Sequence, residues 1–283
     1  MKVVFVGVGA IGLPMALQIK AAGHEVQGVD VAETSRERPR TQGIDAVERY
    51  SLTNKADVVV VMVATPDQLT ALVEEALPTV SGQHWVIMST VGPKSIISAA
   101  DKLQSKGAKV IDAPVTGGTA RASTGELVIF VAGEENSLSY VAPVLTAMGK
   151  MKKVGIRPGD GQGIKVINQH LCSVHIVAAA EALNLAQSLG LDPAQVLPLV
   201  EGGAAGSWML SDRGPRMLQG TEVKVSSAIN IFVKDSGLVS DAAEACAADV
   251  PLLKVAHARY LAAANSGLGQ RDDSRVIETW LQP

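Results

Sequence analysis

A glycine pattern directly after the first apolar run constrains this chain more than any other feature. The strand-like run at 2–6 leads into Gly7-Val8-Gly9-Ala10-Ile11-Gly12, which matches G-x-G-x-x-G, and a helix-like stretch at 11–22 follows. The pattern is weak alone, but this is the context that it requires. Gly7 permits a tight turn, Gly9 lets the backbone approach a pyrophosphate, and Gly12 lets helix and strand pack closely. The N-terminal segment therefore predicts a turn that places dinucleotide phosphates at a helix N-terminus.

An acidic residue ends the second strand-like run, at 25–29. Asp30 lies 18 residues after Gly12. A carboxylate there accepts hydrogen bonds from ribose hydroxyls and repels a 2′-phosphate, which favours NAD over NADP. The counter-evidence is a nearby group of residues able to grip a phosphate: Ser35, Arg36, Arg38 and Arg40. Because Val31 rather than an arginine follows the acid, we expect NAD, with NADP second, and interpret the arginines as a solvated loop.

Short β-branched runs alternate with helix-like stretches through the first half of the chain. Such alternation is typical of a parallel sheet covered by helices. We expect strands at 2–6, 25–29, 58–63, 85–88, 109–111, 127–131 and 152–154, and helices at 11–22, 68–77, 94–106 and 136–148. The run at 58–63 is apolar at every position, as central parallel strands are. The fold class is therefore α/β, with a Rossmann-type doubly wound sheet in an NAD-binding domain over residues 1–160.

Strand signals almost vanish after the breaker cluster at 157–161. Residues 162–189 contain no proline and one glycine, and predict a helix of roughly 25 residues that is apolar on nearly all sides and so buried on several. Gly190 ends it, and Asp192-Pro193 suits the N-cap and first turn of the next helix. We predict an all-α C-terminal domain over 161–283 for substrate binding and oligomerisation, begun by a long interdomain helix. The apolar helix favours a homodimer or homotetramer.

Composition and charge exclude several classes of protein. A net charge of −3 does not favour a nucleic-acid binder. The longest apolar run, 58–64, is far shorter than the ~20 residues of a membrane span. Cys172 and Cys246 neither build a disulfide framework nor show metal-ligand spacing. Because residues 1–6 lead into a glycine loop instead of a cleavage site, no signal peptide fits. We expect a cytoplasmic protein with no metal, nucleic-acid partner or membrane association.

Three further segments match motifs of one known family. Residues 112–118, Asp-Ala-Pro-Val-Thr-Gly-Gly, resemble a D-A-P-V-S-G-G substrate-binding segment. Residues 159–169 resemble a G-x-G-x-x-x-K-x-x-N catalytic segment, and residues 232–238 resemble a K-D-x-G-L cofactor-closing segment. Their order is that of the β-hydroxyacid dehydrogenases, the family of 3-hydroxyisobutyrate dehydrogenase and tartronate semialdehyde reductase. Residues 203–209 and 269–274 are similar to its branch that contains L-threonate dehydrogenase. With the glycine loop, the resemblance covers essentially the whole chain.

The resemblance implies that Lys165 is the general acid/base. Hydride transfer from a hydroxy acid needs a group that takes the alcohol proton, and the reverse reaction needs one that returns it. A lysine that cycles between ammonium and amine serves both directions. Its ordinary pKa is about 10.4, so desolvation would help activity near neutrality. Asn168 lies at i+3 on the same helix and can orient the amine or bond the substrate. A structural lysine at a domain boundary is the alternative, which the Asn168 spacing disfavours.

The resemblance also implies the remaining site residues. Thr116, Gly117 and Gly118 follow a strand end, where open α/β sheets bind ligands, and would cradle the substrate carboxylate together with Asn168. The expected cofactor-binding residues are Gly7, Gly9, Ala10, Ile11, Gly12, Asp30, Val63, Ala64, Gln68, Thr90 and Lys234. The chain departs from the family at four places, which leave the geometry of the nicotinamide pocket open: Thr116 for Ser, Ile87 for Asp, Val63-Ala64 for Leu-Pro, and Gln68 near a common Asn.

These observations predict an NAD-dependent oxidoreductase that transfers a hydride between nicotinamide and a small hydroxycarboxylate. The substrate would be of the 3-hydroxyisobutyrate, glycerate/tartronate semialdehyde or threonate type. The alternatives are an NADP-dependent semialdehyde reductase of the succinic or glyoxylate type, an imine reductase, and a non-catalytic dinucleotide-sensing protein. Asp30 argues against NADP, and the Lys165/Asn168 pair argues against imine reduction. An intact catalytic segment argues against the sensor.

Overall fold

A computed structural model describes residues 1–280 of the chain. The residues fall into two compact units, Met1–Lys165 and a second unit from Val166 onward. The predicted boundary at 160/161 lies at the start of a long helix, α7 (Asp160–Ser188), which begins in the first unit and ends in the second. An α/β sheet followed by an all-helical part confirms the expected fold class.

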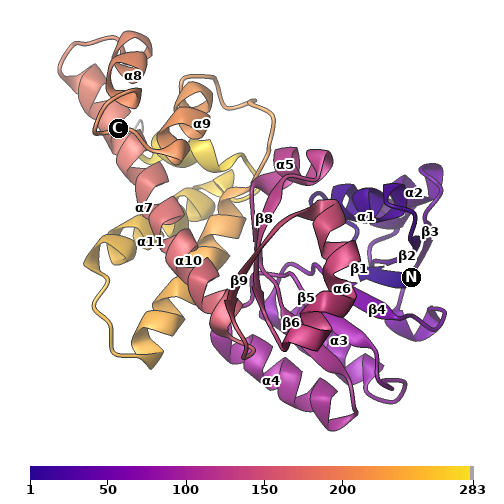
Figure 1. Ribbon diagram of the computed structural model, residues 1–283. Coiled ribbons are helices and arrows are strands. Elements are labelled where there is room, and N and C mark those ends of the chain that lie inside the picture. Colours follow the sequence, from indigo (N-terminus) through magenta and orange to yellow (C-terminus); the bar gives the residue numbers. More distant parts are fainter. Residues whose placement is uncertain (281–283) are drawn as a thin grey trace. The chain divides into compact units, whose positions relative to one another are not determined.

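The first unit is built on one sheet (Figure 1). Its strands are β1 (Lys2–Val6), β2 (Glu25–Val29), β3 (Asp45–Val47), β4 (Val58–Val61), β5 (His84–Ile87), β6 (Lys109–Asp112), β7 (Val115–Thr116), β8 (Leu127–Ala132) and β9 (Gly149–Gly155). The order is β3-β2-β1-β4-β5-β6-β8-β7, with β9 paired to β8. Strands β1 to β6 are parallel, whereas β8 runs antiparallel to β6 and β7. The carboxyl ends of the first six strands therefore share one edge.

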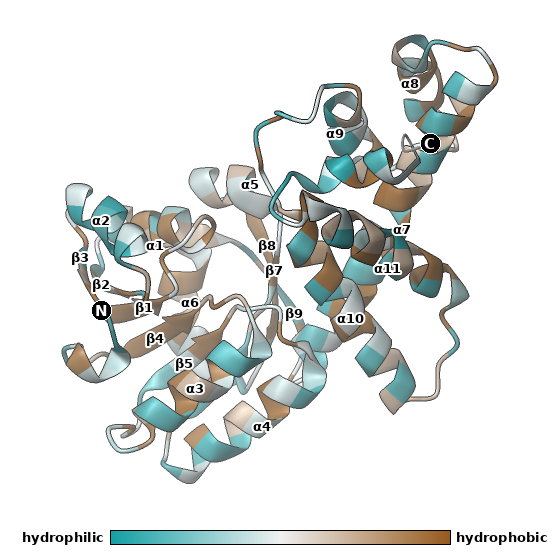
Figure 2. Cartoon of the chain, turned by 180° about the vertical axis from the view of Figure 1, so that it is seen from behind, coloured by the Kyte–Doolittle hydropathy of each residue, from teal (hydrophilic) through white to brown (hydrophobic). Residues whose placement is uncertain are grey.

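Helices cover both faces of this sheet. They are α1 (Gly12–Ala21), α2 (Glu33–Thr41), α3 (Pro66–Ala76), α4 (Gly92–Ser105), α5 (Gly118–Thr124) and α6 (Glu135–Met148). Because side chains alternate along a strand, Val58 and Val60 pack with residues of α1 and α6, while Val59 and Val61 pack with residues of α3 and α4. Strands β1 and β4 are hydrophobic throughout their interior in Figure 2. The doubly wound arrangement follows from strands that bury both faces.

The second unit is helical. After α7 come α8 (Pro193–Glu201), α9 (Trp208–Met217), α10 (Ile229–Ala245) and α11 (Pro251–Ala263), then a π-helical turn (Ala264–Leu268) and a 3-10 segment, η3 (Asp273–Trp280). Gly190 has φ +75°, and the Asp192 side chain accepts a hydrogen bond from the amide of Ala194 at 2.9 Å. The expected stop of the long helix and the cap of the next are both confirmed.

One sequence interpretation is wrong. The arginine-rich segment after Asp30 is helix α2 rather than a solvated loop, and Arg36 is only 8% exposed. Helix α2 is almost entirely hydrophilic (Figure 2), so it has no apolar periodicity to detect. The long helix α7 is buried at Ile176, Ala180 and Leu183, whereas Ile167 and Leu185 are 61% and 56% exposed. Apolar character on all sides shows what a helix can bury, not what covers it.

Candidate functional site

The glycine loop joins β1 to α1 as the motif predicts. A Cβ on Gly7, whose φ is +91°, would lie 2.4 Å from the carbonyl oxygen of Met62. A Cβ on Gly12 would lie 1.8 Å from the carbonyl oxygen of Gly7, so both positions exclude a side chain. No atom lies within 4 Å of a Cβ built on Gly9, and α1 begins at Gly12 with Ile11 as an N-cap residue that makes no side-chain cap. Backbone atoms therefore lie close against Gly7 and Gly12, whereas the space beside Gly9 is open. This arrangement fits a pyrophosphate bound at a helix N-terminus.

Asp30 and its arginine neighbours form one local arrangement. The Asp30 carboxylate accepts a hydrogen bond from the amide of Ala32 at 3.0 Å. The Arg36 guanidinium donates to the carbonyl oxygens of Asp30 and Val31 at 2.8 and 2.9 Å and pairs with Glu33. Arg40 also pairs with Glu33, at 3.0 Å. These contacts give two of the three nearby arginines partners of their own and leave Asp30 as an acidic group after β2.

Other candidate cofactor residues follow β4 and β5 at the same edge. Val63 and Ala64 come directly after β4, and Gln68 forms a capping box with Thr65 at the start of α3. The Gln68 side-chain oxygen accepts from the amide of Ala64 at 2.8 Å, which gives it a structural role beside any ligand contact. Thr90 lies in the turn between β5 and α4.

The predicted carboxylate cradle follows β6. Thr116 ends β7 and is half-buried, and Gly117 and Gly118 have φ of +132° and +67°. A Cβ on Gly117 would lie 2.9 Å from the Arg121 side chain, whereas Gly118 faces open space. Both glycines therefore hold backbone conformations that other residues rarely adopt. The sheet brings this turn, the glycine loop, Asp30 and Thr90 to one edge.

Two buried polar residues inside the recognised motifs escaped the sequence reasoning. Asp112 and Gln162 are both 0% exposed and are hydrogen-bonded to each other. The backbone nitrogen of Gln162 donates to the Asp112 carboxylate at 3.0 Å, and its side-chain nitrogen donates at 3.2 Å. Burial raises the pKa of Asp112 to about 6, against hydrogen bonds from Gln162 and Gly159 that favour the carboxylate. One signal could have found them: Asp112 in segment 112–118 and Gln162 in segment 159–169 are polar motif residues to which the resemblance assigns no role. Lys165, one turn after Gln162 on α7, is 7% exposed.

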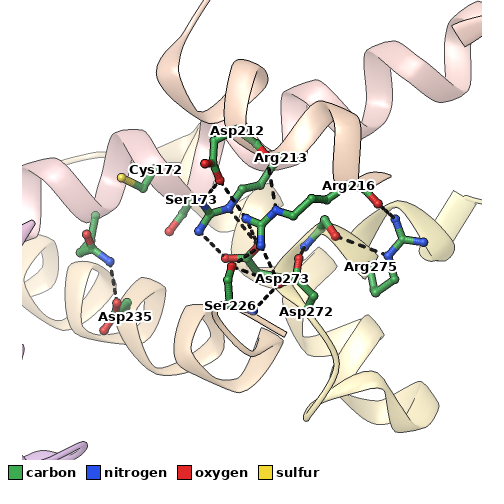
Figure 3. Close-up of polar contacts among 12 residues, drawn as sticks. Cys172, Ser173, Asp212, Arg213, Arg216, Ser226, Asp235, Asp272, Asp273 and Arg275 are labelled. Atoms are coloured by element: carbon green, nitrogen blue, oxygen red, sulfur yellow. Dashed lines mark hydrogen bonds and ion pairs between the residues drawn. The ribbon is translucent and has the colours of Figure 1, made fainter. Parts of the chain in front are cut away.

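In the second unit, residues of α7 and α10 form a chain of polar contacts. The Asn168 amide nitrogen donates to the Gln169 side-chain oxygen at 2.8 Å, and the Gln169 amide nitrogen donates to Asp235 at 2.5 Å. Lys234 Nζ lies 2.7 Å from the other Asp235 oxygen. Asp235, drawn in Figure 3, is 3% exposed, so it is a buried partner rather than a helix-surface carboxylate. Two predicted site residues, Asn168 and Lys234, are thus connected through Gln169 and Asp235.

A cluster of buried charges also lies in the second unit (Figure 3). Asp273 accepts two hydrogen bonds from Arg213, and Asp272 accepts from Arg216 at 2.7 Å. Arg275 donates to the carbonyl oxygens of Arg216 and Gln219 at 2.6 and 2.7 Å. Although burial opposes the charged form, Asp273 and Asp212 hold the pKa of Arg213 above its ordinary value. The charges tie α9 to the start of η3, and they give Asp272 and Asp273 of segment 269–274 their ion-pair partners.

Within the described residues 1–280, no three His, Cys, Asp or Glu side chains are grouped so that they could hold a metal ion. The same part of the chain has no helix long and apolar enough to cross a membrane.

Two family models together match nearly the whole chain. One, described as the NAD binding domain of 6-phosphogluconate dehydrogenase, matches residues 2–157. The other, described as NAD-binding of NADP-dependent 3-hydroxyisobutyrate dehydrogenase, matches residues 159–280. The two matches meet at the start of α7.

Individual relatives match over nearly their full length. An L-threonate dehydrogenase of Cupriavidus necator is 34% identical over 96% of this chain and 94% of its own length. A 2-hydroxy-3-oxopropionate reductase of Escherichia coli is 31% identical over 98% and 96%. A crystal structure of 3-hydroxyisobutyrate dehydrogenase from Salmonella typhimurium superimposes with a TM-score of 0.90 at 31% identity, covering 99% of both chains.

Proposed function

Because the chain belongs to the β-hydroxyacid dehydrogenase family of NAD(P)-dependent oxidoreductases, we propose that it transfers a hydride between NAD and a small hydroxycarboxylate and uses Lys165 as the general acid/base. The observation that carries the proposal is the place of Lys165. It is a nearly buried lysine one helical turn after Gln162, whose hydrogen bonds to Asp112 hold that turn at the carboxyl edge of the sheet.

The cofactor would be held by residues that the first unit brings to this edge. Gly7, Gly9, Ala10, Ile11 and Gly12 would bind the pyrophosphate, Asp30 the ribose hydroxyls, and Val63, Ala64, Gln68 and Thr90 would line the path toward the nicotinamide. The family resemblance adds Lys234 to the cofactor-binding residues. When bound, NAD supplies the hydride acceptor. The preference for NAD rests on Asp30 and on Glu33, whose charge offsets those of Arg36 and Arg40.

The residues of this chain have separate tasks in the reaction. The Lys165 amine takes the hydroxyl proton as the substrate carbon loses its hydride, and the resulting ammonium returns the proton in the reverse direction. Thr116, Gly117 and Gly118 would bind the substrate carboxylate through a hydroxyl and exposed backbone amides. Asn168 would orient the amine or hold the substrate hydroxyl.

The first substrate to test is L-threonate, followed by D-glycerate and 3-hydroxyisobutyrate. L-threonate dehydrogenases are among the similar relatives, and segments 203–209 and 269–274 resemble that branch. We further propose that the residues after 160 serve substrate binding and self-association. We place the enzyme in the cytoplasm, where the thiols of Cys172 and Cys246 would remain reduced.

A spectrophotometric screen of these hydroxy acids with NAD and NADP in parallel tests the proposal. Lys165→Ala should lower turnover of the best substrate by about 10²–10⁴, and Lys165→Arg should not restore it, since a guanidinium cannot accept the proton. NAD affinity should persist in both variants. Lys150→Ala, a change to an exposed lysine of β9, should leave turnover unchanged. Near-normal turnover in Lys165→Ala would remove the catalytic assignment, and equal use of NADP would overturn the cofactor assignment.

A further inference from the structure

The buried side chain of Gln162 joins three segments that the chain sequence keeps far apart. Its side-chain oxygen accepts hydrogen bonds from the amides of Val91 and Gly92, both at 3.0 Å. Its side-chain nitrogen donates to the carbonyl oxygen of Ser89 at 2.9 Å and to Asp112 at 3.2 Å. We call this set of contacts the Gln162 bridge. It uses both ends of the amide, and all five of these residues are buried.

The bridge holds the backbone on both sides of Thr90. Ser89 precedes Thr90, and Val91 and Gly92 follow it, so the turn cannot shift without breaking a bond to Gln162. Helix α4 has no side-chain cap from its own sequence, and the Gln162 oxygen takes the place of one. Helix α3 shows the local solution, because Thr65 and Gln68 cap it from within. The α4 cap comes instead from the first turn of α7.

Asp112 fixes the other side of the bridge. Its Oδ2 accepts from the backbone amides of Gly159 and Gln162 at 2.9 and 3.0 Å, which places a carboxylate at the N-terminus of α7. The motif glycines make this approach possible. Gly159 has φ +103°, and a Cβ on Gly161 would lie 3.0 Å from the Asp112 carboxyl carbon and 2.8 Å from the carbonyl oxygen of Phe130. The segment that carries Lys165 is therefore shaped around Asp112.

We propose that Gln162 is a positioning residue that locks the Thr90 turn to the turn of α7 that carries Lys165. Lys165 lies three residues after Gln162 on the same helix, so a displacement of the amide is passed on to the lysine through rigid backbone. This inference rests on the proposed function for the role of Lys165. It adds that the side-chain amide of Gln162 aligns both the Thr90 turn and Lys165.

The test uses Gln162→Met, which removes the amide at similar volume, and Gln162→Glu, which keeps an acceptor toward Val91 and Gly92 but sets a carboxylate against Asp112. Titration of NADH fluorescence should show affinity lowered about 10-fold in Gln162→Met, because two buried amides beside Thr90 lose their acceptor. Gln162→Glu, which keeps that acceptor, should lose less affinity for NADH than Gln162→Met. Turnover of the best hydroxy acid should fall about 10–100-fold in both variants, the cost of a small misplacement of a reacting group.

The matched control is Gln83→Met. Gln83 is also a buried glutamine of the first unit, bonded to the backbone of Ser81 and Thr79, but it precedes β5 and so lies at the opposite edge of the sheet. This variant should lose stability while keeping NADH affinity within about 2-fold and turnover per folded molecule. A purely structural role for Gln162 predicts that Gln162→Met behaves the same way, and that result would overturn the proposal.

A double-mutant cycle separates this inference from the proposed function. If Gln162 acts through Lys165, Gln162→Met should change turnover less than about 3-fold in the Lys165→Ala background. Equal effects in both backgrounds would contradict the coupling. If Lys165→Ala alone keeps normal turnover, the catalytic assignment fails, and NADH affinity still decides whether Gln162 positions the Thr90 turn.

Discussion

Arg213 and Asp273 form a two-point ion pair between α9 and the start of η3, with Nε 3.0 Å from Oδ1 and Nη2 2.8 Å from Oδ2. The Asp273 side chain is fully buried and that of Arg213 is 10% exposed. Sixty residues separate them in the sequence, so the pair joins parts of the second unit's helical core that are distant along the chain.

Removing one partner of this pair should be costly. Arg213→Ala should lower the free energy of unfolding by about 3–5 kcal/mol, because it leaves Asp273 buried without its main counter-charge. Lys254→Ala breaks the exposed pair with Asp249 and should change it by less than about 1 kcal/mol. Urea denaturation followed by circular dichroism measures both. A loss below 1 kcal/mol in Arg213→Ala would show that the pair does not hold the core.

Asp112 should make stability depend on pH. Its pKa in the folded protein, about 6, lies above the ordinary value of 3.8, so the folded state binds the proton more tightly than the unfolded state. The resulting stabilisation is full below pH 3.8 and is lost as the pH rises through about 6, in total about 3 kcal/mol. Other carboxyls also titrate, so the readout is the difference in unfolding free energy between wild type and Asp112→Asn. That difference should shift against the wild type between pH 4 and 7, and a constant difference would refute the elevated pKa.

Glu33 should influence the choice of cofactor. Glu33→Gln removes the charge that offsets Arg36 and Arg40, so NADPH affinity should rise by about 2–5-fold while NADH affinity stays unchanged. Asp30→Ala should add to this effect by removing a repulsive charge. Fluorescence titration with both cofactors measures the ratio. Glu37→Gln, on the exposed surface of the same helix, is the control. An equal rise in NADPH affinity in this variant would show that net charge alone, and not the position of Glu33, causes the effect.

Two glycines of the first turns of α7 should respond oppositely to alanine. Gly161→Ala should destabilise the protein by about 1–3 kcal/mol, since its Cβ would meet Phe130 and Asp112. Gly163→Ala has no atom within 4 Å of its Cβ and should stabilise by about 0.5–1 kcal/mol through helix propensity. Thermal melts of the two variants give the comparison. Equal changes in stability for the two variants would mean that Asp112 does not pack closely enough against α7 to exclude a side chain at position 161.

The exposed apolar residues of α7 and of the turn that follows it should be covered by another copy of the chain. Light scattering at micromolar concentration should give a dimer or tetramer mass, and Leu185→Glu with Leu189→Glu should reduce it. Leu185 and Leu189 are 56% and 66% exposed. Leu52→Glu, at a leucine of the first unit that is 61% exposed, should leave the mass unchanged. A monomer mass for the unmodified protein would contradict self-association.

Local patterns determined the main features of the fold. The glycine loop, the valine-rich strands and the Asp192-Pro193 cap could be predicted because turn conformation, strand burial and helix capping depend on neighbours within a few residues. Motif order placed Lys165 on a helix and Thr116 at a strand end. Helix α2 was missed because it is stabilised by Arg36 contacts to backbone carbonyls and to Glu33 rather than by an apolar stripe.

Only the tertiary structure decided which polar groups meet. Gln162 contacts segments 50 and 70 residues away, Asp235 is buried against Gln169 from another helix, and Arg213 reaches Asp273 across 60 residues. The residue types alone predict only that a buried amide or charge needs a partner. Which partner it finds is set by strand order and helix packing, because hydrogen bonds are short and directional whereas apolar burial is not.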